Sequence, residues 1–276
     1  MERKMAPVLK WAGGKTQLLE QIADSMPPEY NHYYEPFLGG AAVLFGISPA
    51  QAFVNDVNEQ LVNLYTQLKA AAESVIAKVN EMDEALCTEE LYYAARKRYN
   101  AKIASRDFDT ECAALMIWLN KHCFNGLYRV NSGGLFNVPY NKRAGGRSID
   151  ESNIRAISEY LQHADITITC LDFEKACESV AAGDFVYFDS PYVPESATAS
   201  FTDYTTDGFR LADHERLAAL FKRLDSIGAK VMLSNNDVSL VRSLYQGYHI
   251  QSLDVKRMIN SNASKRTGKE VLITNY

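Results

Sequence analysis

The run Asp189-Ser190-Pro191-Tyr192 combines three groups that could act on a planar amino-heterocycle, and it follows the apolar, strand-like segment 185–188. The Asp189 carboxylate and the Ser190 backbone carbonyl could each accept a hydrogen bond from an exocyclic amine, and the Tyr192 ring could stack on the heterocycle. Two such acceptors would favour a pyramidal amine whose lone pair lies on nitrogen. A strand followed by an ordinary proline turn has the same pattern, so the tetrapeptide alone leaves both interpretations open.

A second candidate site lies nearer the N-terminus, where Gly39-Gly40 precedes a helical pattern and Asp56 follows the short strand pattern 52–55. Glycines admit close approach of a nucleoside to the backbone, and a strand-end carboxylate can accept hydrogen bonds from both ribose hydroxyls. The alternative is a plain glycine turn with Asp56 capping the helix that begins near residue 58.

Two other nucleotide-binding motifs are excluded by their spacing. Gly14-Lys15-Thr16 imitates the end of a phosphate-binding loop, but Leu9 stands where that loop requires glycine. Ala41 and Leu44 break the Gly-x-Gly-x-x-Gly spacing of a dinucleotide loop.

The composition is that of a globular protein of about two domains, since 47% of the 276 residues are hydrophobic. The longest apolar run, 37–47, is well short of the ~18 residues that a membrane span requires, and no signal-peptide pattern is present. The five cysteines contain no Cys-x-x-Cys, so neither a disulfide framework nor a metal site is indicated, and we expect a cytoplasmic protein.

The formal net charge of -5 argues against a nucleic-acid partner, but the charges are unevenly distributed. No acidic residue lies between Glu111 and Asp150 or between Asp254 and Glu270. Solvated basic loops would explain one such stretch, whereas two stretches favour contacts with phosphates and bases. Their basic residues are Lys121, Arg129, Lys142, Arg143 and Arg147 in the first, and Lys256, Arg257, Lys265, Arg266 and Lys269 in the second.

Hydrophobic periodicity divides the chain into an α/β body and a helical insertion. Helical patterns at 16–25 and 211–226 and strand patterns at 52–55, 166–171, 185–188, 230–233 and 271–274 enclose a region, 58–123, that is almost entirely helical in pattern. Glycine, proline and polar residues break that pattern from 125 to 146. We therefore predict one domain from residues 1–57 and 165–276 and a second from 58–164.

Three motifs occur in an order that resembles the Dam-type adenine-specific DNA methyltransferase family, the GATC-specific alpha group of the D12 class. They are Lys-Trp-Ala-Gly-Gly-Lys at 10–15, Glu-Pro-Phe-Leu-Gly at 35–39 and the box at 189–192. The likeness continues through 125–129, 136–139, 196–202 and 233–235, so it covers nearly the whole chain. Ser190 departs from the family, which usually has proline at that position. The resemblance implies a Rossmann-like methyltransferase sheet for the first domain and a target-recognition domain with a DNA-reading hairpin loop for the second.

The same resemblance implies S-adenosylmethionine as the methyl donor and assigns residues to its site. Lys15 lies at a helix start, where a cation needs an anionic neighbour such as a cofactor carboxylate or Glu35. Asp56 would hold the ribose, and Asp189 would border both cofactor and target base. The cofactor residues implied are Trp11, Lys15, Glu35, Phe37, Gly39, Asp56, Asp172, Phe173 and Asp189.

For DNA, the resemblance places Asn125, Leu127 and Arg129 in the major groove and Phe124 at the position of an intercalating aromatic ring. Lys10 and Pro139 occupy other base-reading positions, and Arg143 replaces a tyrosine found in some relatives. A guanidinium can pair bidentately with guanine, although a phosphate contact or a structural salt bridge would also explain Arg129.

The resulting hypothesis is methylation of adenine N6 within GATC in double-stranded DNA, by a protein that acts as a monomer. The base would be flipped out of the duplex, and its amine would attack the sulfonium methyl group in line. No cysteine follows a proline, so a covalent cysteine mechanism is not indicated, and no metal is needed. Two alternatives remain: a methyltransferase for the exocyclic amine of cytosine, and a DNA-binding relative inactivated by Ser190. The sequence leaves open whether the enzyme accompanies a nuclease, acts alone or comes from a phage.

Overall fold

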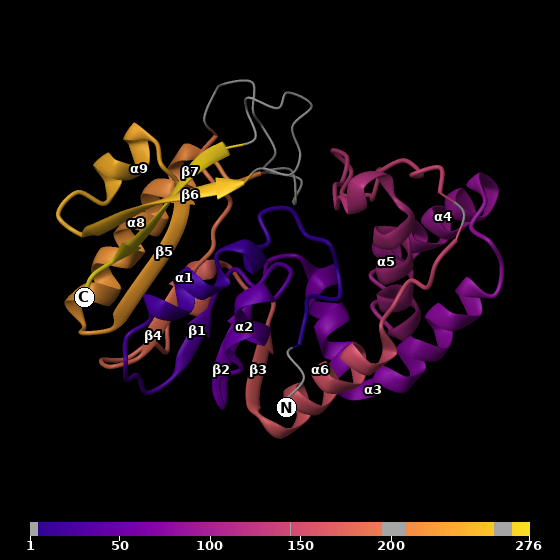
Figure 1. The fold of residues 1–276 in the computed structure, drawn as a ribbon, viewed down its shortest axis with the longest axis horizontal. Helices are drawn as coiled ribbons and strands as arrows, with labels where there is room; N and C mark the ends of the chain where they lie inside the picture. The colour runs from indigo at the N-terminus through magenta and orange to yellow at the C-terminus, as the bar shows by residue number, and fades with distance from the viewer. Residues whose placement is uncertain (1–4, 144, 195–207, 257–266) are drawn as a thin grey trace.

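The computed structural model describes residues 5–143, 145–194, 208–256 and 267–276 (Figure 1). Its strands are β1 (Tyr33–Glu35), β2 (Gln51–Asn55), β3 (Asp165–Thr169), β4 (Phe185–Phe188), β5 (Lys230–Asn236), β6 (His249–Lys256) and β7 (Thr267–Thr274). In the described part of the chain they form one seven-stranded sheet in the order β3-β2-β1-β4-β5-β7-β6. β1 to β5 are mutually parallel, whereas β7 pairs antiparallel with β5 and β6. The predicted α/β class is confirmed.

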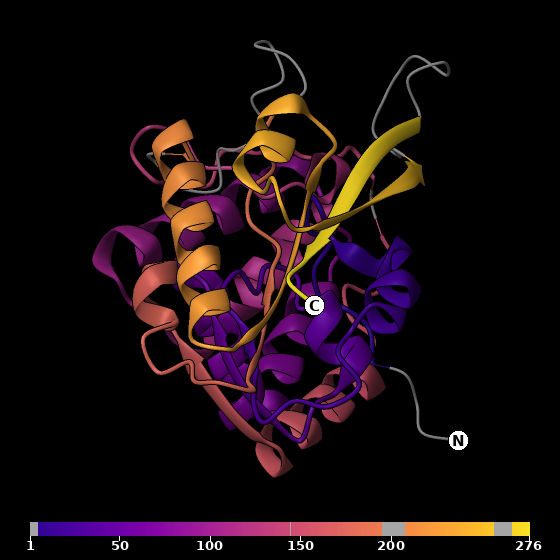
Figure 2. The ribbon, with the colours of Figure 1, turned by 90° about the vertical axis from the view of Figure 1, so that its left-hand side faces the viewer.

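Both faces of the sheet are covered, as the central strand β4 shows. Its four side chains are all buried, which is typical of a parallel strand between two layers of helices. Phe185 and Tyr187 join one buried cluster, and Val186 and Phe188 join the other. The first cluster includes α1 (Leu19–Asp24) and α2 (Ala42–Ile47), and the second includes α7 (Phe173–Ala176), α8 (Leu211–Ser226) and α9 (Ser239–Leu244). Figure 2 views the molecule from the side of α8, α9 and the β6–β7 hairpin.

Four helices between β2 and β3 form the second part of the molecule, to the right in Figure 1. They are α3 (Glu59–Asp83), α4 (Glu89–Ser105), α5 (Thr110–His122) and α6 (Glu151–His163). Each begins after a polar residue whose side chain accepts a hydrogen bond from a backbone N–H of the first turn: Asn58, Thr88, Asp109 and Asp150. α3 packs against α5 and α6, and the buried apolar cluster continues from these helices to the sheet.

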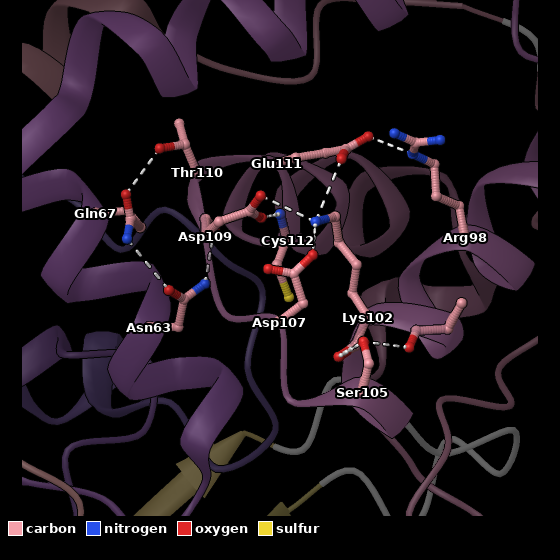
Figure 3. A network of polar contacts seen from close by, with 11 residues as sticks. Asn63, Gln67, Arg98, Lys102, Ser105, Asp107, Asp109, Thr110, Glu111 and Cys112 are labelled. Carbon is pink, nitrogen blue, oxygen red and sulfur yellow. Dashed lines mark hydrogen bonds and ion pairs between the residues drawn. The ribbon is translucent and has the colours of Figure 1, made fainter.

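A polar network centred on Lys102 joins α3, α4 and the start of α5 (Figure 3). The Lys102 ammonium lies 2.6 Å from Asp107, 2.9 Å from Asp109 and 3.4 Å from Glu111, and its side chain is only 10% exposed. The Asn63 side chain donates to the Asp109 carbonyl at 3.1 Å. These contacts join the last turn of α4 to the start of α5, and the loop from 124 to 143 follows the other end of α5.

Candidate active site and DNA interface

Parallel strands direct their carboxyl ends to one edge of the sheet, and four of the predicted site residues follow such ends. Gly39 follows β1, Asp56 follows β2, Asp172 follows β3 and Asp189 follows β4. The carboxyl edge of an open α/β sheet is the usual place for a ligand. The structure therefore brings together residues that are up to 150 positions apart in the sequence (39 to 189).

The Gly39 turn and Asp56 contact each other directly. The Gly39 N–H donates to Asp56 Oδ2 at 2.9 Å, the Asn58 N–H donates to Asp56 Oδ1 at 2.9 Å, and the Tyr65 hydroxyl donates to the Gly39 carbonyl at 2.9 Å. Gly39 has φ of +48°, which favours glycine. Burial raises the pKa of Asp56, and the two backbone donors oppose that rise. The cap of α3 is Asn58, so Asp56 supports the turn without being the cap itself.

Asn55, which the sequence reasoning left without a role, holds three of the strand-end loops together. Its buried side chain donates to the carbonyls of Pro36 at 3.1 Å and Leu171 at 2.9 Å. Its Oδ1 accepts from the Leu171 N–H at 2.8 Å. The sequence feature that could have indicated this role is the amide of Asn55 in the otherwise apolar strand 52–55, because a buried polar side chain needs hydrogen-bond partners.

Trp11 connects the glycine turn with the helical part. A Cβ placed on Gly39 or Gly40 would lie 3.2 Å or 3.0 Å from the Trp11 side chain, so glycine allows this close approach. The indole also stacks with the Tyr128 ring, at 5.1 Å between ring centroids. Trp11 thus lies between the predicted cofactor turn and the loop that follows α5.

Lys15 has an anionic partner, and it is Asp189. Lys15 lies in the 3₁₀ helix Lys15–Gln17, is 4% exposed, and places Nζ 2.6 Å from Asp189 Oδ1. The same Nζ lies 4.6 Å from the centroid of the Tyr192 ring. Burial raises the pKa of Asp189, whereas Lys15 and a hydrogen bond from Ser234 lower it.

Glu35 is buried near this pair. Its side chain is 2% exposed overall, and Oε2 accepts a hydrogen bond from the Tyr33 hydroxyl at 2.8 Å. Burial raises the pKa of Glu35 to about 8, so its carboxyl is mostly protonated at neutral pH. A neutral Glu35 leaves Asp189 as the charge that balances Lys15.

The Tyr192 end of the box is anchored to the antiparallel part of the sheet. The Tyr192 hydroxyl donates to Glu270 Oε2 in β7 at 2.8 Å. The next residue, Val193, donates its N–H to the side chain of Asn235 in β5 at 3.0 Å. Ser190 is 2% exposed, and its hydroxyl has no hydrogen-bond partner among the described residues. In the sequence, Asn235 was marked only as part of the resemblance at 233–235, and Glu270 only as the acidic residue that ends the second basic stretch.

Phe37, Phe173 and Asp172 lie at the β1 and β3 ends. Phe37 and Phe173 contact each other with 5.4 Å between centroids. Arg216 of α8 places its guanidinium 4.7 Å from the Phe173 ring and 2.9 Å from Asp172 Oδ1. Arg216 is therefore a neighbour of this predicted pair that the sequence did not reveal, because it lies 44 residues from Asp172.

Lys10 and the loop after α5 meet through one amide. The Asn120 side chain accepts from the Lys10 N–H at 2.9 Å and donates to the carbonyls of Lys10 and Gly126, each at 3.0 Å. Phe124 is 51% exposed, and Asn125 has φ of +58° in the short 3₁₀ helix Phe124–Gly126. Lys10, Phe124, Asn125 and the half-buried Leu127 thus belong to one surface.

Arg129 lies at the base of the hairpin formed by Val130 and Phe136, and it is exposed. Its Nε donates to Asn137 Oδ1 at 2.8 Å, and it makes no ion pair with any described residue, so the salt-bridge interpretation has no support. Pro139 is exposed and accepts from the Phe124 N–H at 2.8 Å, while Arg143 is exposed nearby in sequence. The motif 196–202 and the basic residues Arg257, Lys265 and Arg266 lie outside the described residues.

Residues 11–259 match the family model described as "D12 class N6 adenine-specific DNA methyltransferase". The chain belongs to this family. The match agrees with the order of the strand-end residues and with the α/β sheet, which is consistent with the S-adenosylmethionine-dependent methyltransferase fold.

Relatives of this family resemble the chain over almost its whole length. A protein named Type II methyltransferase M1.LlaDCHI from Lactococcus lactis subsp. cremoris is 41% identical, over 99% of this chain and 96% of the relative. Type II methyltransferase M.MjaIII from Methanocaldococcus jannaschii is also 41% identical, over 99% of this chain and 100% of the relative. DNA adenine methylase from Escherichia coli (strain K12) is 32% identical, over 99% of this chain and 96% of the relative.

Membership of the D12 family makes this protein an adenine-specific DNA methyltransferase, and it does not favour the cytosine and inactive-binder alternatives. Over the described residues, no helix has the length and hydropathy of a membrane span. Within the same residues, no three histidine, cysteine or acidic side chains gather as metal ligands.

Proposed function

We propose that this D12 methyltransferase transfers the methyl group of S-adenosylmethionine to N6 of a flipped-out adenine within GATC in double-stranded DNA. The observation that carries this proposal is the common location of Asp189, Lys15 and Tyr192 with the Gly39–Asp56 turn at the carboxyl edge of the sheet. The first three residues suit an amine acceptor, and the turn suits a nucleoside. Methyl transfer to a base requires both next to each other.

The residues present fit S-adenosylmethionine. Each oxygen of Asp56 accepts one backbone N–H, and a carboxylate oxygen can accept a second donor, so the ribose hydroxyls have acceptors. Trp11 packs closely against the glycine turn, and Lys15 supplies a buried positive charge for the cofactor carboxylate. Phe37 and Phe173 offer aromatic surface for the adenine ring, beside Asp172. When bound, the cofactor supplies an activated methyl group.

The chain's own residues position and polarise the target amine. Asp189 and the Ser190 carbonyl would accept its two hydrogens, which shifts the lone pair toward nitrogen. Tyr192, held by Glu270, would stack on the base. Alignment of the amine about 3 Å from the methyl group would supply much of the rate enhancement. Glu35, buried near Lys15 and mostly protonated, would add little charge to the cofactor site at neutral pH.

The helical part is proposed as the target-recognition domain, residues 58–164, inserted into the catalytic domain of 1–57 and 165–276. Its exposed loop offers an aromatic side chain, Phe124, to fill the space left by a flipped base. Exposed cationic and amide groups around it would contact base edges and phosphates. The residues proposed for DNA contact are Lys10, Phe124, Asn125, Leu127, Arg129, Pro139 and Arg143. We expect the protein to act as a monomer in the cytoplasm, where its DNA substrate lies.

Labelled S-adenosylmethionine and three duplexes test the proposal. A GATC duplex should accept label, and a duplex in which 2-aminopurine, which lacks the 6-amino group, replaces both adenines of GATC should not. A third duplex, in which 2-pyrimidinone, which lacks the 4-amino group, replaces both cytosines of GATC, should still accept label if adenine is the target. Asp189→Ala should abolish transfer, because the amine loses an acceptor, while a mobility-shift assay shows retained duplex binding. Transfer by Asp189→Ala at the wild-type rate would remove Asp189 from the mechanism, and label on the 2-aminopurine duplex would refute adenine methylation.

A further inference from the structure

Ser234 is a buried hydroxyl directly behind the candidate acceptor. It lies in β5, has no exposed surface, and places Oγ 3.0 Å from Asp189 Oδ1. The register of the sheet explains this contact, because Phe188 of β4 pairs with Leu233 of β5 and each precedes one of the two residues. The Tyr187 hydroxyl, also wholly buried, lies 3.0 Å from Ser234 Oγ on the other side.

The hydrogen bonds that link Tyr187, Ser234 and Asp189 run in one direction. An ionised carboxylate can only accept, so the Ser234 hydroxyl donates to Asp189. Ser234 Oγ is then free to accept the hydrogen of Tyr187. The hydroxyls of Tyr187 and Ser234 thus both donate a hydrogen bond to a described partner.

The two oxygens of Asp189 differ as a result. Two donors contact Oδ1: the Ser234 hydroxyl of β5 and the Lys15 ammonium of the 3₁₀ helix Lys15–Gln17. No described residue donates a hydrogen bond to Oδ2, and the side chain is 20% exposed. One donor would leave the carboxylate free to swing about that contact, whereas two donors from different elements fix its plane.

We propose that Ser234 is a positioning residue, which fixes the Asp189 carboxylate so that Oδ2 is presented to the amine of the target base. The inference rests on the proposed function, since it concerns the same carboxylate. Ser234 touches neither base nor methyl donor, and it acts only through Asp189. Tyr187 orients Ser234 in turn.

Removing the hydroxyl should slow the chemical step and spare binding. In Ser234→Ala, we expect the single-turnover methylation rate to fall about 10-fold to 100-fold, as for other lost partners of a functional group. The dissociation constants for S-adenosylmethionine and duplex should change less than about twofold, because no binding contact is lost. Ser234→Thr keeps the hydroxyl and should recover most of the rate.

The acidic side of the pH–rate profile (the acid limb) provides a second readout. General destabilisation of the fold would not change the pH at which this limb falls. Among the described residues, the titratable groups that face Asp189 are Lys15, Glu35, Glu270, Tyr187 and Tyr192, and all of them remain in Ser234→Ala. Ser234 lowers the pKa of Asp189, so its loss should move the acid limb to higher pH.

A matched pair of variants separates positioning from stability. Ser234→Ala leaves the buried Tyr187 hydroxyl without a partner, which destabilises the fold, and Ser234→Ala with Tyr187→Phe removes that unpaired group. The double variant should regain thermal stability and remain slow. Single-turnover rates between pH 5.5 and 9 on a GATC duplex are measured for the wild type, Ser234→Ala, Ser234→Thr and the double variant.

The outcomes are distinct. If the wild type is active and Ser234→Ala methylates at the same rate with an unshifted acid limb, the inference is overturned and the proposed function stays intact. Recovery of the full rate in the double variant would also overturn it, because stability alone would then explain the loss. A wild type that methylates no duplex would overturn the proposed function, and the inference with it.

Discussion

Replacing Glu35 with glutamine should remove a pH-dependent loss of stability. Glu35 is fully buried beside Tyr33, and burial raises the pKa of its carboxyl from 4.5 to about 8. A carboxyl with a raised folded-state pKa binds its proton more tightly in the folded protein than in the unfolded chain. Its contribution to stability is therefore complete below about pH 4.5 and is lost as the pH rises through about 8.

The size of this effect follows from the pKa difference. The interval from 4.5 to about 8 spans about 3.5 pH units, and each unit corresponds to about 1.4 kcal/mol. The wild type should thus lose on the order of 5 kcal/mol of unfolding free energy from this one group between pH 4 and pH 9. Glutamine keeps the shape and the acceptor for the Tyr33 hydroxyl but carries no titrating proton.

Urea unfolding of the wild type and Glu35→Gln at half-unit steps from pH 5 to pH 9 measures the difference. The two curves should nearly coincide at pH 5, and the variant should be more stable by several kcal/mol at pH 9. Glu73→Gln is the matched control: Glu73 is 69% exposed and Arg155 lowers its pKa, so its difference curve should be flat over this range. A flat difference curve for Glu35→Gln as well would refute a protonated Glu35.

Three further variants test other parts of the molecule. Arg129→Ala should weaken discrimination at one outer base pair of the site by about 1–3 kcal/mol, in competition binding against substituted duplexes, and equal weakening on every sequence would instead indicate a phosphate contact. Ser190→Pro should leave the single-turnover rate unchanged or raise it up to about threefold, because the Ser190 hydroxyl has no partner among the described residues and proline stiffens the turn; a protein active only after this change would indicate an inactive natural chain. Lys102→Met should lower the unfolding free energy by about 2 kcal/mol, since three carboxylates lose their shared cation, and an unchanged urea midpoint would contradict that role.

Periodicity predicted the long, regular elements well and the short ones poorly. The helix expected at 211–226 is confirmed as Leu211–Ser226, and the strand at 185–188 as Phe185–Phe188. β1 and β6 were not predicted. β1 has only three residues and ends in Glu35, whose burial depends on a hydroxyl supplied within the same strand, and β6 owes its pairing to β7. Such elements depend on tertiary partners rather than local pattern.

The candidate site divides in the same way. Asp56 and Asp189 were visible because each follows a predicted strand, and parallel strands place their ends together, whereas Gly39 was visible as part of a glycine pair before a helical pattern. The partner of Lys15 was not, since the sequence suggested Glu35 or a cofactor carboxylate and the structure places Asp189 there, with Glu35 mostly neutral. Ser234 lies in the motif 233–235, but Ser234 and Asn120 act across pairs of elements, so only their spatial neighbours reveal their roles.

The amide of Asn55 has a consequence for the energetics of cofactor binding. It ties together the loops after β1, β2 and β3, which are the segments proposed to meet the nucleoside. Three loops that moved independently would each lose conformational freedom when the ligand arrived, and that entropy would be subtracted from the affinity. Because one buried side chain already links them in the absence of ligand, their ordering is completed during folding. On the proposed function, the affinity for the cofactor would then depend on a residue outside the proposed set of contacts.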